Sequence, residues 1–348
     1  MNHNRQLDEL LSQVKEKAEN AREEKDFASV FSLLRDFQQT AGPIKYDNRV
    51  KWYVFTAIGV LGGGFALAYF LNPGIQRELG DLGYAILGAF ALALIVTLVV
   101  IGLANSAIDE ISELIFSKDV YFDNGLEQVD IEGKQKGLYR EYKKAFGDFR
   151  NRGDEGRYVK RLVKGAWTGK EHSFPYEHYA FHYVRVYYVP VTTKVGKTTV
   201  TTMQRRTETL YRYGLILDFP FVKGLAARSG GGSYDYPEEF QPVSEEFNGI
   251  FSVGAASAQS AAKFLKPAVV LAFLELAKHF NGLNVEINRD GRMNIAFSDN
   301  DVLDLDRKFS IAQPDEFEQE IRSHLDLPKL RLLLEFVETL KKHNDSNF

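Results

Sequence analysis

The sequence predicts an α+β membrane protein, with an N-terminal amphipathic helix, a two-helix transmembrane hairpin and a cytoplasmic antiparallel α+β domain. Three observations support this fold class. Two long uncharged apolar runs lie in the first third of the 348 residues, and a segment rich in aromatic and β-branched residues follows near the middle. After that segment, short strand and helix signals follow in irregular order, which is typical of an antiparallel sheet with attached helices.

Residues 1–50 are expected to form a cytoplasmic helical segment. Apolar residues recur at helical spacing from Leu7 to Phe37, and Gly42-Pro43 ends the pattern. The apolar stripe is short of four clean heptads, which favours packing on the protein's own C-terminal domain over a coiled coil with a partner. The sequence leaves both arrangements open.

The transmembrane hairpin is assigned to residues 51–104. Neither WYVFTAIGVLGGGFALAYFL (52–71) nor LGYAILGAFALALIVTLVVIGL (82–103) contains a charged residue. At about 1.5 Å per residue, each run crosses a hydrocarbon core of about 30 Å. The ten residues between them contain the turn signal Pro73-Gly74 and are too few to cross back, so the two helices must be antiparallel neighbours.

Small residues on the two runs predict where the helices approach each other. Gly59 and Gly63 form a GxxxG step on the first run, and Gly88 on the second run would let the two backbones approach closely. The alternative is that these glycines reflect only the frequency of glycine in membrane helices.

The distribution of Lys and Arg predicts the orientation. Arg35, Lys45, Arg49 and Lys51 precede the first run, whereas the connection between the runs contains only Arg77. The positive-inside bias therefore places both termini in the cytoplasm and the short connection outside.

Residues 105–155 are expected to form a helical stalk followed by a basic juxtamembrane region. From Lys134 to Lys170 the chain has twelve Lys and Arg against four acidic residues. Such a block beside a membrane favours contact with anionic lipids of the inner leaflet, and the alternative is an ordinary solvated surface. The candidate contacts are Lys143, Lys144, Arg150 and Arg152, and nucleic acid is not an expected partner.

Residues 156–348 are predicted to form the cytoplasmic α+β domain. Strands are expected at 178–191, 198–203, 207–219 and 247–253, and helices at 255–265, 267–280 and 317–340, the last broken at Pro328. Val285 to Phe297 alternates on both sides of Asp290-Gly291, which predicts a hairpin with a type I′ turn.

One short motif resembles a phosphate-binding loop. VGKTTV (195–200) contains the Gly-Lys-Thr step, but Val191 stands where the motif needs its first glycine. A strand follows in place of the helix whose N-terminus would face the phosphate. A hairpin turn is therefore the better interpretation.

Two further groups of residues were weighed as metal ligands. His178 and His182 on a strand would lie about 13 Å apart, too far for one metal, and are expected at the surface. Asp299, Asp301, Asp304 and Asp306 lack the glycine and glutamate of a calcium loop, and are expected in a solvated loop. The chain has no cysteine, so no thiolate site is available. No catalytic residue, metal or cofactor is predicted.

The C-terminal part of the chain resembles a bacterial membrane family known as domain of unknown function 3137. The likeness lies in YRYGLILDFPFVKG (211–224), EEFNGIFSVGAASAQSAAKFLKPAVVLAFLEL (245–276) and VEINRDGRMNIAF (285–297). The resemblance implies a multi-pass protein of the bacterial inner (cytoplasmic) membrane, with two membrane helices before a cytoplasmic domain. It supplies no catalytic residues.

The function expected from these observations is that of a non-enzymatic scaffold or partner-binding module at the cytoplasmic face. Its partners would be membrane lipids and a protein, or a second copy of the chain. The alternatives are an enzyme of unrecognised type in the cytoplasmic domain and an accessory subunit of a membrane transport complex. The two apolar runs carry no charge, which disfavours a transport path through them.

Overall fold

The computed structural model describes residues 3–150, 152–195, 198–230 and 236–345. The chain forms two compact units. The first unit contains the chain up to Asp119 together with Asp306–His324, and the second contains Val120–Leu305 together with the residues from Leu325 onward. The chain therefore crosses between units three times, and the basic region after Asp123 lies in the same unit as the sheet.

The N-terminal segment of the first unit is a pair of helices. α1 (His3–Asn20) is followed by a short 3-10 helix, η1 (Glu24–Phe27), and by α2 (Ala28–Ala41). The single N-terminal amphipathic helix expected from the sequence is therefore two helices, because the helical conformation is interrupted at residues 21–23. There the Asp26 carboxylate accepts the backbone N–H groups of Arg22 (2.8 Å) and Glu23 (3.2 Å).

The apolar stripe of this pair packs within the protein, as favoured over a coiled coil with a partner. The buried faces of α1 and α2 meet, and α2 also contacts α11 (Pro314–Ile321) near the C-terminus. The rings of Phe31 and Phe317 are 5.9 Å apart, and Arg35 Nε lies 2.9 Å from Asp315 Oδ1.

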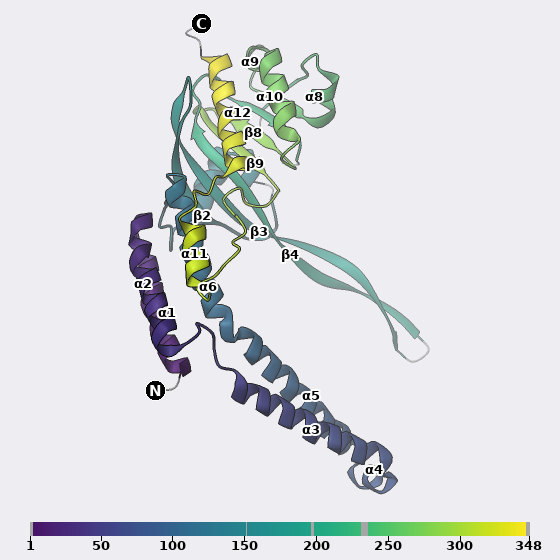
Figure 1. Ribbon diagram of the computed structural model, residues 1–348. Coiled ribbons are helices and arrows are strands. Elements are labelled where there is room, and N and C mark those ends of the chain that lie inside the picture. The colour runs from purple at the N-terminus through teal and green to yellow at the C-terminus, as the bar shows by residue number, and fades with distance from the viewer. Residues whose placement is uncertain (1–2, 151, 196–197, 231–235, 346–348) are drawn as a thin grey trace. The chain divides into compact units, whose positions relative to one another are not determined.

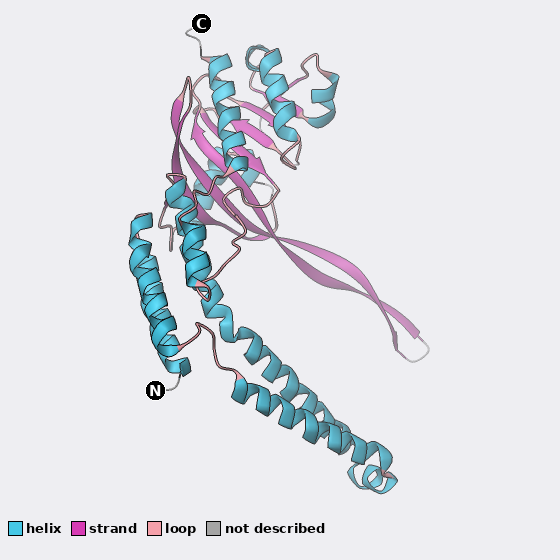
Figure 2. Cartoon of the chain, viewed as in Figure 1, coloured by secondary structure: helices cyan, strands magenta, loops and turns pink. Residues whose placement is uncertain are grey.

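The two apolar runs form long helices at the expected positions. They are α3 (Arg49–Leu71) and α5 (Asp81–Gly102), which lie side by side as a hairpin (Figure 2). α5 continues through η2 (Leu103–Asn105) into α6 (Ser106–Asp123), giving one apolar helix over Asp81–Asp123. Both helices are long and apolar enough to cross a membrane, and they are 6% and 0% buried over their most apolar windows.

The connection between α3 and α5, where Pro73-Gly74 is a turn signal, is a short helix, α4 (Pro73–Leu79). Pro73 occupies the first helical position, where its missing N–H is not needed. The Asn72 side chain caps the helix by accepting the N–H of Gly74 at 2.9 Å.

The second unit is built on one antiparallel sheet, which confirms the predicted α+β class. Within the described part of the chain the strand order is β1-β2-β3-β4-β9-β8-β5-β7-β6 (Figure 1). The strands are β1 (Glu127–Gln128), β2 (Glu155–Thr168), β3 (Ser173–Val195), β4 (Thr198–Asp218), β5 (Leu225–Arg228), β6 (Glu238–Phe240), β7 (Ser252–Ala255), β8 (Asn284–Ile287) and β9 (Arg292–Phe297). The long strand β2 was not predicted, and the two segments expected at 198–203 and 207–219 are one strand.

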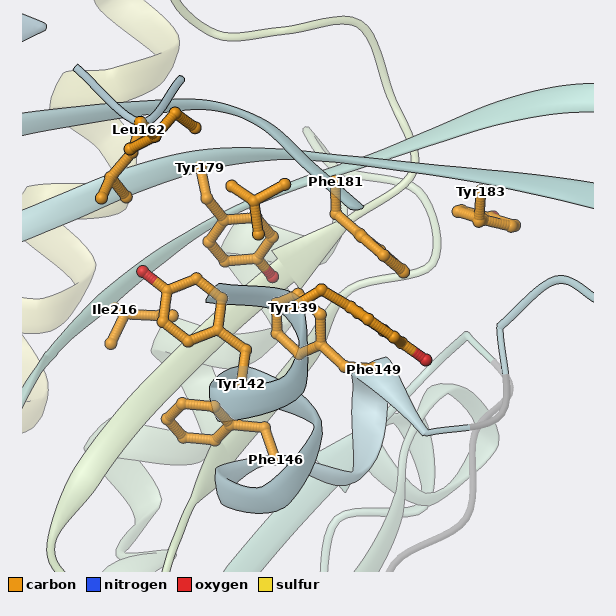
Figure 3. Close-up of a cluster of buried hydrophobic side chains, with 11 residues drawn as sticks. Tyr139, Tyr142, Phe146, Phe149, Leu162, Tyr179, Phe181, Tyr183 and Ile216 are labelled. Carbon is orange, nitrogen blue, oxygen red and sulfur yellow. The ribbon is translucent and has the colours of Figure 1, made fainter. Parts of the chain in front are cut away.

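Helices cover both faces of this sheet. Besides the end of α6 from Val120 onward, the helices of the second unit are α7 (Gln135–Ala145), η3 (Gly147–Phe149), α8 (Glu245–Ile250), α9 (Ala258–Phe264), α10 (Pro267–Ala277) and α12 (Pro328–Asn344). α7 and η3 pack on β2 and β3, where Tyr139 stacks on Phe181 at 5.5 Å and Phe149 lies 5.0 Å from Tyr179 (Figure 3). α10 and α12 pack on each other through Phe273 and Phe336, and α12 lies over the opposite face.

Two local predictions in this unit are wrong. The strand expected at 247–253 begins as α8, because Ser244 caps it by accepting the N–H of Phe247 at 3.3 Å. The β8–β9 hairpin is confirmed, but its turn is not type I′. Gly291 (φ +85°) has the only positive φ in the loop, and its N–H donates to Asn288 O at 3.2 Å. This is a three-residue loop, a type I turn followed by a left-handed glycine.

Candidate functional site

The apolar hairpin has its close contacts at glycines other than those predicted. A Cβ added at Gly83 would lie 2.1 Å from Cε2 of Tyr69, and one added at Gly62 would lie 3.0 Å from Cβ of Phe90. Tyr69 is 2% exposed, and its hydroxyl donates to Gly80 O at 2.8 Å. The tyrosine is therefore seated on Gly83, where a larger residue would displace it.

The predicted contact residues Gly59, Gly63 and Gly88 do not make this approach. A Cβ at Gly63 or Gly88 would meet nothing within 4 Å, and one at Gly59 would only touch Leu94 at 4.0 Å. The prediction is shifted on both helices, because the GxxxG spacing shows which residues share a face but not how the helices are rotated about their axes.

The four residues predicted to contact anionic lipid belong to the second unit, at the C-terminal end of α7 and just beyond it. Lys143 and Lys144 are exposed. Arg150 is half-buried and folds back on α7, donating from Nε to Lys143 O (3.1 Å) and from a terminal nitrogen to Lys144 O (3.3 Å). It thereby satisfies carbonyl groups at the helix C-terminus, where a cation is favourable.

Arg152 is directed inward and is not available to a lipid headgroup. Its side chain is 14% exposed and donates to Asp148 Oδ1 from Nε (3.2 Å) and from a terminal nitrogen (2.6 Å). The four cations therefore do not form one surface. Lys143 and Lys144 face solvent, whereas Arg150 and Arg152 form hydrogen bonds within the second unit.

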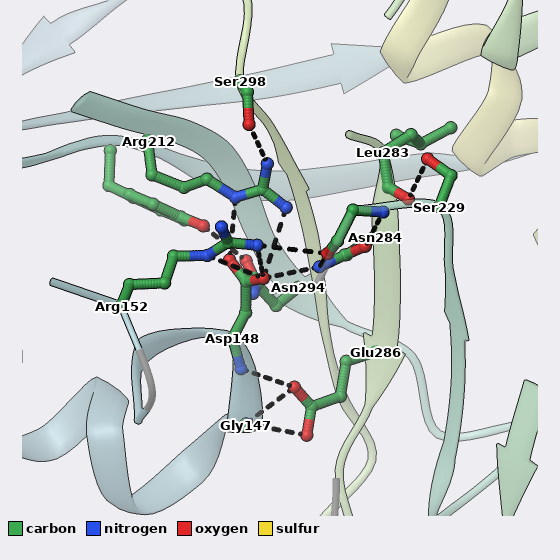
Figure 4. Close-up of polar contacts among 12 residues, drawn as sticks. Gly147, Asp148, Arg152, Arg212, Ser229, Leu283, Asn284, Glu286, Asn294 and Ser298 are labelled. Carbon is green, nitrogen blue, oxygen red and sulfur yellow. Dashed lines mark hydrogen bonds and ion pairs between the residues drawn. The ribbon is translucent and has the colours of Figure 1, made fainter. Parts of the chain in front are cut away.

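A buried polar network lies between η3 and the sheet (Figure 4). Asp148 is 2% exposed and Arg212, on β4, is fully buried. The Asp148 carboxylate accepts from Arg212 Nε at 3.0 Å and from Asn284 Nδ2 at 2.6 Å, in addition to Arg152. Arg212 also donates to Ser298 Oγ at 2.6 Å.

The electrostatics of this network favour the ionised carboxylate. Burial acts to raise the pKa of Asp148, but Arg212 and then Arg152 outweigh it and hold the pKa below its ordinary value. Every charge in the network has a partner, as buried charges require. The arrangement anchors η3 to β4 and β8, which is a structural role.

A cleft of about 360 Å³ opens beside this network. Its lining includes Lys144, Arg150 and Arg289, together with Tyr236 and the 3% exposed Glu286 of β8. Glu286 accepts the backbone N–H of Gly147 at 2.8 Å, and the Tyr236 hydroxyl lies 3.4 Å from its carboxylate.

The carboxyl group of Glu286 titrates near neutral pH. Burial raises its pKa to about 7, the Gly147 N–H acts to lower it, and nearby Asp148 acts to raise it. A carboxyl group of shifted pKa in a cleft is a candidate for proton transfer, although buried structural carboxyls show the same shift. Sequence reasoning missed this residue, because it alternates with Val285 and Ile287 as a solvent-facing residue of a strand would.

The histidine and aspartate groups do not form a metal site. No cluster of three potential ligands occurs among the residues that the structure describes. The expectation of a surface position is wrong for His178, which is fully buried with Nε2 3.5 Å from Asp301 Oδ1. Burial, and then Arg161, hold its pKa well below the ordinary value, so the ring is neutral.

The acidic loop is likewise only partly solvated. Asp304 is exposed, but Asp301 is 6% exposed, pairs with Arg161 and accepts the N–H of Leu303 at 3.0 Å. The expectation of a solvated loop therefore fails at Asp301, because its contact with a residue 140 positions earlier cannot be inferred from the local sequence.

The far ends of β3 and β4 extend beyond the sheet as a two-stranded ribbon (Figure 1). The last pairing of β2 with β3 is at Val184, and the first pairing of β4 with β9 is at Tyr213. From Arg185 onward β3 pairs only with β4. We call this part, residues 186–195 and 198–207, the β-arm; Gly196 and Lys197 of the turn predicted from VGKTTV lie outside the described residues.

The β-arm carries exposed apolar and aromatic side chains. Tyr188 is 59% exposed and Met203 is 62% exposed, and Tyr187 and Val200 are more than 40% exposed. Isolated two-stranded ribbons are at best marginally stable in water, and exposed strand edges are open to pairing. The β-arm therefore has the properties of a contact element.

Comparisons with protein-family models, with curated proteins and with solved structures gave no match. The resemblance to the bacterial membrane family thus stays a prediction. The site and the fold are the grounds on which function can be argued.

Proposed function

We propose that this chain is a membrane-anchored, non-enzymatic module that binds a protein partner at the cytoplasmic face of the bacterial inner membrane. The observation that supports membrane anchoring is the exposure of the apolar helices α3 and α5. Over their most apolar windows, α3 and α5 bury 6% and 0% of their residues inside the protein. Contiguous apolar surface of this extent marks contact with another apolar phase.

The proposed topology places both termini inside and α4 outside. It is supported by the Lys and Arg imbalance around α3, and the family resemblance adds the bacterial source. Reporter fusions at Asn20, Gln76 and Gly230 test it. Only the fusion at Gln76 should be active outside, and an active external reporter at Gly230 would reject this topology.

Binding of a protein partner is proposed for the β-arm. Its exposed Tyr188 and Met203 offer apolar contacts, and the outer edge of β4 between Thr198 and Arg212 has no strand neighbour among the described residues. A partner strand added to this edge would gain backbone hydrogen bonds and side-chain contacts together. Pro190 removes one backbone donor from β3, which makes β4 the better edge.

Site-specific photo-crosslinking in intact cells tests this assignment. A photoreactive residue at Tyr188 should give one stoichiometric adduct. The same residue at Val243, an exposed apolar position away from the arm, should give none. Equal adducts from both positions, or none from Tyr188, would contradict a binding role for the β-arm.

A second candidate function is an enzyme in the second unit, favoured by Glu286 alone. Its carboxyl group has a pKa of about 7, lies at a cleft and is within 3.4 Å of the Tyr236 hydroxyl. A group of this kind can act as a general acid or base. Turnover of a candidate substrate that is lost in Glu286→Gln, with folding unchanged, would favour this function over the first.

A further inference from the structure

A second cleft, of about 460 Å³, lies in the first unit where α3 begins. It is formed by the segment between α2 and α3 and by the start of α1. The residues that bear on its chemistry are His3, Lys45, Asp47, Arg49 and Trp52.

The segment that forms this cleft is held in place by hydrogen bonds. Asn4 of α1 donates from Nδ2 to Asp47 O at 3.1 Å and accepts the Asp47 N–H at 2.8 Å. From the other side, the side-chain oxygen of Asn105 accepts the N–H of Tyr46 at 3.4 Å. The cleft is thus tied to α1 and to the residues that follow α5, close to where both apolar helices begin or end.

The cleft has a positive balance of charge. Nδ1 of His3 lies 3.1 Å from Ala41 O and Nε2 lies 3.0 Å from Lys45 O. Both ring nitrogens of His3 are therefore directed at backbone carbonyl groups. Lys45 and Arg49 are exposed. The Asp47 carboxylate accepts the N–H of Arg49 at 2.9 Å and lies 3.8 Å from Nε of the same arginine, so the two cations exceed this acid by one positive charge.

The position of the cleft identifies the anion that it meets, if the chain is anchored as proposed above. Arg49 is the first residue of α3, and Trp52 in its first turn is 49% exposed. Tryptophan at the end of a membrane helix lies at the level of the headgroups. At that level the abundant anion is the phosphate of a phospholipid.

We propose that this cleft binds the headgroup phosphate of an anionic phospholipid, with Lys45 and Arg49 around the phosphate and Trp52 beside the glycerol. This site takes the place of the lipid contact expected at Lys143 and Lys144. Those lysines lie in the other unit, whereas Lys45 and Arg49 are joined directly to a proposed membrane helix.

Lipid retention by the purified full-length protein tests the proposal. The protein in detergent is incubated with equal phosphatidylglycerol and phosphatidylcholine, washed, and analysed by native mass spectrometry. The wild type should retain phosphatidylglycerol preferentially. Lys45→Gln with Arg49→Gln should reduce that retention at least tenfold, while the conservative pair Lys45→Arg with Arg49→Lys should keep most of it.

The matched control is Lys143→Gln with Lys144→Gln, which removes the same charge from an equally exposed pair. It should retain phosphatidylglycerol as the wild type does. Equal retention in both Gln variants, or loss confined to the control, would overturn the assignment. The Gln variants are compared only when their melting temperatures match the wild type. An altered melting temperature is resolved with Lys45→Ala and Arg49→Ala singly, and full retention in both would also overturn it.

A further arm separates lipid from a soluble anion. Millimolar glycerol phosphate or inorganic phosphate should not displace the retained lipid, and displacement by either would show that the site takes a free phosphate group instead. The outcome is also separate from anchoring. A chain that needs detergent for extraction but retains no phosphatidylglycerol rejects only the lipid site, whereas a chain soluble without detergent rejects the proposed function itself.

Discussion

Replacing Asp148 with Asn should destabilise the second unit by several kcal/mol, because the buried cation of Arg212 then loses its carboxylate partner. Within the described residues, Asp148 is the carboxylate that pairs with Arg212, whose side chain is fully buried. The substitution keeps the size of the side chain but removes its charge and one acceptor oxygen. Arg212 is then left with Ser298 Oγ and an amide in place of a carboxylate.

The magnitude follows from the burial of the pair. Removing one partner of a buried ion pair costs about 3–5 kcal/mol, because the other charge stays in a medium that solvates it poorly. Arg212 donates twice to Asp148, at 3.0 and 3.2 Å, so this pair is in the strong, hydrogen-bonded class. Asn can still accept one of these bonds, which places the expected loss near the lower limit, about 3 kcal/mol.

Fluorescence of Trp167 gives a local assay for this loss. The chain has two tryptophans, and changing Trp52 to Phe leaves only Trp167, on β2 of the second unit. Urea unfolding of the full chain in detergent then reports the free energy of unfolding of that unit. The midpoint should fall in the Asp148→Asn variant while the slope with urea stays the same.

An exposed ion pair on the same sheet supplies the control. Glu208 pairs with Arg185 at 3.5 Å, with both side chains about half-exposed, so Glu208→Gln should cost less than about 1 kcal/mol. Adding Arg212→Met to Asp148→Asn should recover part of the loss, since the unpaired charge is gone. A loss below about 1 kcal/mol in Asp148→Asn alone would refute the account of the network.

Three further predictions concern single residues. The free energy of unfolding should fall by about 3 kcal/mol between pH 4.5 and pH 7. The folded-state pKa of Glu286 is raised from 4.5 to about 7, so the folded state binds the proton of this carboxyl group more tightly than the unfolded state does. Urea unfolding of Glu286→Gln should lack this dependence on pH. Gly83→Ala should lower the melting temperature in detergent by displacing Tyr69, at a cost of about 1–3 kcal/mol, whereas Gly63→Ala, with open space, should not. Gly291→Ala should lower the free energy of unfolding by about 1 kcal/mol or more in urea because the φ of this glycine is +85°, whereas Gly249→Ala, in a helix with open space, should not. Equal effects of Gly83→Ala and Gly63→Ala would contradict the Tyr69 contact, and equal effects of Gly291→Ala and Gly249→Ala would contradict the turn.

The elements that sequence predicted well are those defined by local patterns. α3 and α5 follow from uncharged runs, α10 from Pro267 at its first position, and the β8–β9 hairpin from alternation on both sides of Asp290-Gly291. The break expected at Pro328 within 317–340 separates α11 from α12. Each of these patterns lies within one continuous stretch of chain. Local propensity and periodicity are therefore enough to identify them.

The candidate site was not predicted, because its residues are brought together only by contacts between segments far apart in the sequence. Asn284, Glu286 and Asn294 alternate with apolar residues and so suggest a solvated face of the hairpin. That face is instead covered by η3, whose Gly147 N–H group donates to Glu286 from 139 residues earlier in the chain. No local pattern reveals which segment will cover a polar face.

The same limit applies to the basic block. A run of cations shows where charge lies along the chain but not which way each side chain points. Arg152 turns inward because it pairs with the buried Asp148 and also donates to Gly230 O at 3.3 Å. The rotation of α3 and α5 about their axes could not be predicted for a related reason. Glycine spacing shows which residues share one face of a helix, but not which face meets the other helix.

The return of α11 to the first unit has a consequence for how the chain is made. Arg35 and Asp315 are 280 residues apart, so α2 leaves the ribosome long before the helix that covers it. At a synthesis rate of roughly 5–20 residues per second, the apolar face around Phe31 waits about 14–56 s for Phe317. During that interval the proposed membrane hairpin can already insert, and the N-terminal helices must be kept from aggregating by other means. If α3 and α5 anchor the chain as proposed, proteins truncated before Pro314 should be targeted to the membrane yet be recognised by chaperones and proteases that bind exposed apolar helices.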